Sequence, residues 1–163
     1  MAGEVSFDVV SEFDRQELVN AIDQAEREMR TRYDLKDTKS ELRLDKDAVT
    51  LHAPSEMTLN SIRDLLQSKM VRRGLSLKVL KFGDVEPAAG GTVRQTGRLQ
   101  QGISPDLARD ISKLIRDTHP KAKAQTQGDT VRVSSKSKDE LQAIIRALKA
   151  RDYDVPLQFI NYR

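Results

Sequence analysis

The residues best suited to bind a ligand lie between positions 123 and 138, where polar side chains recur at every second position. Lys123, Gln125 and Gln127 alternate along one segment, and Arg132 continues the pattern in the next. A period of two places such side chains on one face of a β-sheet. The planar guanidinium group of Arg suits phosphates and guanine edges, and a Gln amide can pair with a base edge. The pattern indicates a nucleotide or phosphate site; the alternative is a sheet face that meets only water.

Neighbouring basic residues could add to this site. Lys136 and Lys138 flank the predicted start of a helix, where free backbone N–H groups and the helix dipole favour anions. Their alternative role is that of ordinary solvated surface lysines. A further segment shows the same alternation, and chain order assigns it to the same sheet. Its outward side chains are Arg94, Thr96, Arg98 and Gln100.

The sequence offers little for catalysis or metal binding. It contains no cysteine, and its only histidines are His52 and His119, for which we expect structural or solvent-exposed roles. Neither a phosphate-cradling P-loop nor a Rossmann glycine fingerprint occurs. An acylphosphatase would need a glycine-flanked arginine loop after the first strand, and none is present. We therefore expect a protein that is not an enzyme and has no cofactor and no metal.

Composition points to a modest charge and to no membrane segment. The chain has 163 residues and a formal net charge of +3. Residues 1–82 carry 14 basic and 15 acidic side chains, whereas residues 83–163 carry 14 and 10, so the second half suits a phosphate-bearing ligand better. No apolar run approaches the ~20 residues of a membrane span. The acidic start MAGEVSFDVVSE does not resemble a signal peptide, and we expect a cytoplasmic protein.

Four amphipathic helices and several strands would position these residues. Each helix begins at a capping residue that is followed by apolar residues at helical spacing. The predicted caps are Asp14 with Glu17, Ser55, Ser104 with Pro105, and Ser137 with Glu140. Segments of period two lie between the helices, in the order βαββαβ followed by βαββαβ. A shift of 82 residues superimposes Val49 on Val131 and Leu66 on Leu148, which indicates an internal repeat.

This element order predicts an α+β protein with two ferredoxin-like domains. Each would be a four-stranded antiparallel sheet with two helices on one face, so the other face would meet water, pair with another domain or bind a ligand. An RNA-recognition domain of this fold stacks bases on aromatic residues of its central strands. The corresponding segments, DAVTLHA at 47–53 and DTVRVSS at 129–135, contain no aromatic residue. Base stacking of this kind is disfavoured, while RNA binding through phosphates stays open.

Several long motifs resemble the YajQ family. They are SFDVVSE at 6–12, NAIDQAERE at 20–28, TRYDLK at 31–36, RRGL at 72–75, LQQGI at 99–103, AQTQGDTVRVSSKSKDELQA at 124–143 and QFINYR at 158–163. The resemblance covers nearly the whole chain, with the motifs in the family's order. It implies two ferredoxin-like domains that exchange their first strands.

Under this resemblance the domains are not continuous in sequence. Residues 12–91 would form the first domain, completed by 92–100, and residues 101–163 the second, completed by 5–11. A linker would span about 83–91. The exchange would remove Arg94 and Arg98 from the polar face described above and would bring Ser6 and Asp8 to it.

The resemblance also implies a function. Members of the family are described as nucleotide-binding proteins; some bind cyclic di-GMP and act on transcriptional regulators, and RNA or tRNA binding is associated with others. No enzymatic activity is established for the family. Arg132 and Lys138 would then meet phosphates, while Gln125, Gln127 and Asp8 would contact base or ribose. The predicted nucleotide-binding residues are Ser6, Asp8, Gln125, Gln127, Arg132, Lys136 and Lys138.

Overall fold

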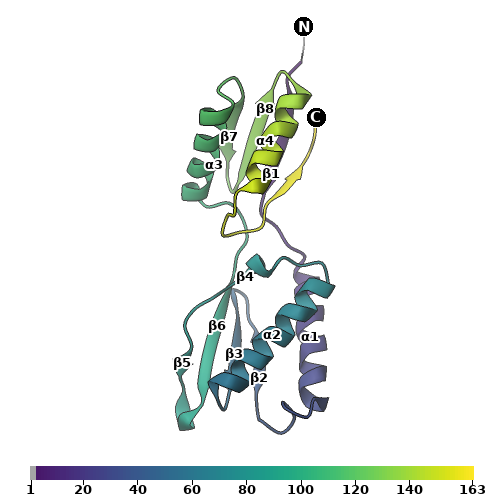
Figure 1. The fold of residues 1–163 in the computed structure, drawn as a ribbon, viewed down its shortest axis with the longest axis vertical. Coiled ribbons are helices and arrows are strands. Elements are labelled where there is room, and N and C mark those ends of the chain that lie inside the picture. Colours follow the sequence, from purple (N-terminus) through teal and green to yellow (C-terminus); the bar gives the residue numbers. More distant parts are fainter. Residues whose placement is uncertain (1–2) are drawn as a thin grey trace. The chain divides into compact units, whose positions relative to one another are not determined.

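The computed structural model describes residues 3–163, which form two compact units (Figure 1). The terminal unit contains the chain up to Glu12 together with Gln101–Arg163, and the central unit is Phe13–Gln100. Each unit has a hydrophobic core of its own. Both combine antiparallel strands with two α-helices, so the predicted α+β class is confirmed.

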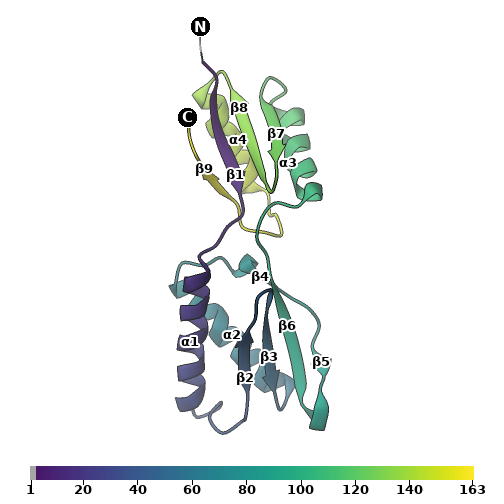
Figure 2. The ribbon, with the colours of Figure 1, turned by 180° about the vertical axis from the view of Figure 1, so that it is seen from behind.

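The terminal unit is a four-stranded antiparallel sheet with its helices on one face. Its strands are hydrogen-bonded in the order β7-β8-β1-β9, which places β1 between β8 and β9. Figures 1 and 2 show both helices on the same side of this sheet. The elements in chain order are β1 (Val5–Val10), α3 (Pro105–Thr118), β7 (Lys123–Gln127), β8 (Thr130–Ser135), α4 (Lys138–Ala150) and β9 (Gln158–Ile160).

Local sequence explains the elements of the terminal unit. The hydroxyls of Ser104 and Ser137 accept hydrogen bonds from N–H groups in the first turns of α3 and α4, as predicted for N-caps. In β8 the alternate residues Val131 and Val133 are fully buried, and so is Phe7 of β1. These apolar side chains face the helices, which leaves the polar positions of the same strands on the open face.

The central unit has the same architecture with a different chain order. Its strands follow the order β2-β3-β6-β4, and the short β5 also pairs with β6. Both long helices begin at predicted caps, Asp14 and Ser55. The elements are α1 (Arg15–Thr31), β2 (Glu41–Leu44), β3 (Ala48–Ala53), α2 (Glu56–Arg72), the 3-10 helix η1 (Leu77–Val79), β4 (Leu80–Phe82), β5 (Glu86–Pro87), the 3-10 helix η2 (Ala89–Gly91) and β6 (Val93–Leu99).

Strand β6 corrects the assignment made from chain order alone. It pairs along its length with β3, so Arg94 and Arg98 belong to the sheet of the central unit and not to that of residues 123–135. The segment 83–91, for which a linker is predicted, lies within the central unit. Its Gly83 N–H donates to the Thr96 carbonyl at 3.0 Å, and β5 pairs with the start of β6.

Candidate functional site

Register brings the polar side chains of β1, β7 and β8 together on the open face of the terminal unit. Arg132 lies directly opposite Asp8 on one side and opposite Gln125 on the other. Ser6 lies opposite Ser134, one step along the same face. Gln127 is at the end of the β7–β8 hairpin, opposite Thr130. Asp8, Arg132 and Gln125 therefore form one continuous polar row across three strands.

Asp8 is the buried member of this row. Only 7% of the residue is exposed, although its side chain is a carboxylate on the open face. Its Oδ1 accepts a hydrogen bond from Arg132 Nε at 3.0 Å, and its Oδ2 accepts one from Asn161 Nδ2 at 2.8 Å. Each carboxylate oxygen thus has a partner within the protein, as a buried charge requires.

These contacts keep Asp8 charged. Burial by itself would raise the pKa of the Asp8 carboxyl, because a charge is poorly solvated there. The hydrogen bonds from Arg132 and Asn161, together with the positive charges of Arg132 and Arg163, outweigh that effect and lower the pKa below its ordinary value. Asp8 is therefore an anion at neutral pH and holds the guanidinium group of Arg132 in a fixed place.

Arg132 is the exposed cation of the row. Its side chain is 32% exposed, and its Nε is bonded to Asp8. Within residues 3–163 its two terminal guanidinium nitrogens have no hydrogen-bond partner, so they can donate to a ligand. The exposed Gln125 lies beside it on β7 with an amide that can donate and accept. A fixed guanidinium with a neighbouring amide is suited to a phosphate group attached to a polar ring.

Sequence reasoning missed Asn161 as a partner of Asp8. The backbone of Asn161 is left-handed, with a φ of 59°, a conformation that asparagine tolerates better than most residues. β9 pairs Ile160 with Asp8, yet Ser6 exchanges backbone hydrogen bonds with Arg163 and not with Tyr162. One extra residue therefore lies in this strand, which is the arrangement of a β-bulge. An Asn near the end of a strand was the only signal for it.

Lys136 and Lys138 lie outside the polar row. Both are exposed and flank Ser137, the cap of α4. Lys138 instead lines a pocket of about 360 Å³ at the start of α4, together with one other predicted residue, Ser6. The remaining lining residues are Val5, Leu141, Gln142, Tyr162 and Arg163. Of the predicted residues, Ser6 thus belongs to both the open face and the pocket, Lys138 to the pocket alone, and Lys136 to neither.

A second set of basic residues lies on the open face of the central unit. We call Arg43, Lys81, Arg94 and Arg98 the central basic face; their registers with β3 and β6 place them on the side opposite the core. Arg43 and Arg94 have acidic neighbours in Glu41 and Glu86, at 3.8 and 3.2 Å. Within residues 3–163, Lys81 and Arg98 have no ion-pair partner, and they lie opposite each other on β4 and β6.

The two histidines make ordinary polar contacts. His52 Nε2 lies 2.9 Å from Thr92 Oγ1, and His119 Nδ1 lies 2.9 Å from Thr118 Oγ1. In the described part of the chain, no cluster of three or more His, Asp or Glu side chains could hold a metal ion. The same part contains no helix that is long and apolar enough to cross a membrane.

Comparison with known proteins identifies close relatives over the full length. Residues 5–163 match the family described as "Nucleotide-binding protein YajQ-like". The chain is 56% identical over 165 residues to a "Nucleotide-binding protein" of Roseiflexus castenholzii and 56% identical over 163 residues to one of Thermosynechococcus vestitus. A third relative, from Trichodesmium erythraeum, is 55% identical over 163 residues. Each alignment covers 100% of this chain and 100% of the relative.

Proposed function

The chain belongs to the YajQ-like family of nucleotide-binding proteins, as its motifs predict, and from this premise we propose that it is a cytoplasmic effector that binds cyclic di-GMP. In this proposal the protein does not turn the nucleotide over; it passes the signal to a regulator of transcription. The relatives are named for nucleotide binding and not for an enzymatic activity, which supports a binding role.

The observation that carries the proposal is the Asp8–Arg132 pair on the open face of the terminal unit. Asp8 fixes Arg132 through Nε, and the terminal nitrogens can then donate to one phosphate in a fork. Because both oxygens of Asp8 are already bonded, we assign Asp8 the positioning of Arg132 in place of direct contact with guanine. Because Asp8 already orders the Arg132 guanidinium in the free protein, this side chain loses less conformational entropy when the ligand binds.

The other predicted residues surround this pair. We propose that Gln125 and Gln127 contact base or ribose, because both are exposed on β7, Gln125 directly opposite Arg132 and Gln127 two residues further along. Ser6 is a hydroxyl donor one step along the open face, next to Ser134. Lys136 and Lys138 would add positive charge at the start of α4, where an anion is favoured.

Isothermal titration of the full-length protein with cyclic di-GMP at physiological salt, with GTP as the comparison ligand, tests the proposal. Saturable binding of cyclic di-GMP alone is expected, and Arg132→Gln should weaken it at least tenfold. Arg116→Gln changes an exposed arginine of α3 and is the matched control. Absence of heat with cyclic di-GMP would contradict the proposed function. Unchanged affinity in Arg132→Gln would contradict the proposed site.

RNA is the second candidate ligand, favoured by the central basic face. Lys81 and Arg98 have no acidic partner there among the described residues, so both can meet phosphates. Binding through several phosphates weakens steeply with salt, whereas a small nucleotide held by a few hydrogen bonds responds less. If RNA is the ligand, the double variant Lys81→Gln/Arg98→Gln should lower both the affinity for a tRNA and the slope of its salt dependence. Equal tRNA affinities for the variant and the wild type would rule out this face.

A further inference from the structure

We infer that the pocket at the start of α4 holds one nucleobase and the phosphate next to it. The pocket measures about 360 Å³ and is bounded by β1, by α4 and by the segment after β9. Its lining combines an aromatic ring, two aliphatic side chains, a hydroxyl, an amide and two cations, without an acidic residue. The inference rests on the proposed function and states where part of the nucleotide binds.

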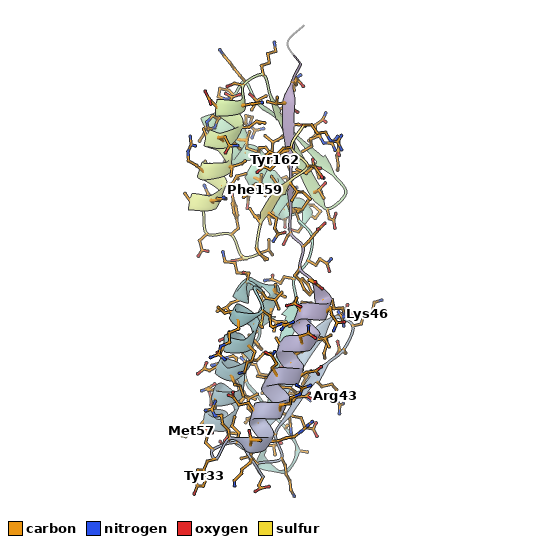
Figure 3. The ribbon with its side chains drawn as sticks, turned by 90° about the vertical axis from the view of Figure 1, so that its right-hand side faces the viewer. Tyr33, Arg43, Lys46, Met57, Phe159 and Tyr162 are labelled. Atoms are coloured by element: carbon orange, nitrogen blue, oxygen red, sulfur yellow. The ribbon has the colours of Figure 1, made fainter. Side chains whose placement is uncertain are left out.

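Tyr162 provides the surface on which a base can stack. The residue is 58% exposed, and its ring centroid lies 6.2 Å from that of the buried Phe7. Phe7 is held in turn by an edge contact with Phe159, at 5.9 Å between centroids. Figure 3 shows the rings of Phe159 and Tyr162 in the terminal unit. An aromatic ring that is supported on one side and exposed on the other is the platform that protein–base stacking uses.

Two side chains of the pocket can bind the phosphate. Lys138 and Arg163 both line it, and neither has an ion-pair partner within residues 3–163. The acidic residues closest in sequence to Lys138 are Asp139 and Glu140, which do not line the pocket. The Glu140 carboxylate accepts a hydrogen bond from the Ser135 hydroxyl at 2.6 Å. The charge of Arg163 also acts on the nearby Asp8 carboxylate, so Lys138 is the cation of the pocket that is most available to an anion.

The remaining lining matches the other properties of a base. Val5 and Leu141 offer apolar contact to a flat ring, and the Gln142 amide can donate to or accept from its edge. A volume of about 360 Å³ lies at the low end of the usual range for ligand sites. It suits one base with one phosphate, which a mononucleotide such as GMP and one half of cyclic di-GMP both provide.

Titration of the full-length protein with GMP, cyclic di-GMP and inorganic phosphate tests the inference. Tyr162→Leu removes the stacking ring, and Tyr33→Leu changes an exposed tyrosine of the central unit as a matched control. We expect Tyr162→Leu to weaken binding of both nucleotides about tenfold and Tyr33→Leu to leave it unchanged. Lys138→Gln should also weaken binding of both nucleotides. Lys113→Gln, on α3, is its matched control and should leave binding unchanged.

Methyl NMR of the wild-type protein provides a second readout that does not depend on a variant. The ring current of a bound base should shift the methyl resonances of Val5 and Leu141, whereas the buried Val133 serves as the internal reference. Inorganic phosphate should leave these methyl groups unmoved. Equal shifts with phosphate alone would overturn the assignment of a base to the pocket.

The outcomes separate this inference from the proposed function. If cyclic di-GMP binds the wild type, loses affinity in Arg132→Gln and binds Tyr162→Leu as it binds the wild type, the pocket inference is overturned and the proposed function stands. If the wild type binds neither nucleotide, both are overturned. Loss of affinity in Tyr162→Leu together with the methyl shifts supports both.

Discussion

Replacement of Asp8 by asparagine tests whether the charge of this carboxylate stabilises the terminal unit. Asp8→Asn keeps the size of the side chain. The new amide oxygen can accept from Arg132 Nε, and its NH₂ group can donate to Asn161 once that amide turns over. The substitution therefore removes the charge of Asp8 with little loss of hydrogen bonding, whereas Asp8→Ala removes both.

The expected cost follows from the burial of the two partners. An exposed ion pair is worth about 0–1 kcal/mol, and loss of one partner of a buried pair costs about 3–5 kcal/mol. The Asp8 side chain is 11% exposed and that of Arg132 is 32% exposed, so this pair lies between these limits. We expect Asp8→Asn to lower the free energy of unfolding by about 1–2 kcal/mol at pH 7 and Asp8→Ala by about 2–4 kcal/mol.

The effect should depend on pH in one direction. The pKa of Asp8 is lowered in the folded protein, so its carboxylate stabilises the fold above the ordinary aspartate pKa of about 3.9. This contribution is lost as the pH falls through the folded-state value. The stability difference between wild type and Asp8→Asn should thus be constant between about pH 7 and 5 and shrink below about pH 4.

Urea unfolding followed by circular dichroism measures this difference at each pH. Asp117→Asn, at an exposed position near the end of α3, is the control and should stay within about 0.5 kcal/mol of the wild type. Equal stability of Asp8→Asn and wild type at pH 7 would refute the argument. A difference that persists undiminished at acid pH would also refute it, since the charge could not then be the cause.

Two further predictions concern the backbone. Asn161→Gly keeps the left-handed conformation but removes the hydrogen bond to Asp8, so it should lower the free energy of unfolding by about 1 kcal/mol. Asn161→Val also places a β-branched residue in this strained conformation and should cost about 1–3 kcal/mol more. Equal losses for the two variants in urea unfolding would argue against backbone strain at this position. A Cβ on Gly97 would lie 2.8 Å from the Phe82 ring, so Gly97→Ala should destabilise the central unit by about 1–3 kcal/mol. Gly83→Ala, whose nearest neighbour is 3.8 Å away, should be much milder, and similar thermal melts for the two variants would contradict this reasoning.

Local patterns predicted most of the fold because caps and periodicity are local properties. Ser104 and Ser137 cap their helices as predicted, but the Glu140 carboxylate accepts from the Ser135 hydroxyl and does not complete the predicted cap with Ser137. Pairing between distant segments was harder to predict. The sequence predicts a cap in which Glu17 acts together with Asp14, yet the Glu17 carboxylate accepts two hydrogen bonds from Arg73, each at 2.9 Å. The Asp14 side chain accepts from the Gln16 N–H instead.

In the candidate site, too, local features were predictable and contacts between distant segments were not. The period of two predicts that Gln125 and Arg132 share one face of neighbouring strands, and the structure places them directly opposite each other. Period two also placed Arg94 and Arg98 on one face of a strand, but periodicity does not say which sheet the strand joins. The contact between Asp8 and Asn161 depends on an extra residue after β9, which no local pattern announces.

The most direct test of nucleotide binding by the terminal unit is a titration of the ¹⁵N-labelled protein with cyclic di-GMP, followed by amide NMR. We expect saturable shifts confined to the terminal unit, largest for Ser6 to Asp8 and for Gln125 to Arg132. Amide signals of the central unit should stay in place. Absence of shifts, or shifts centred on the central basic face, would contradict nucleotide binding by the terminal unit.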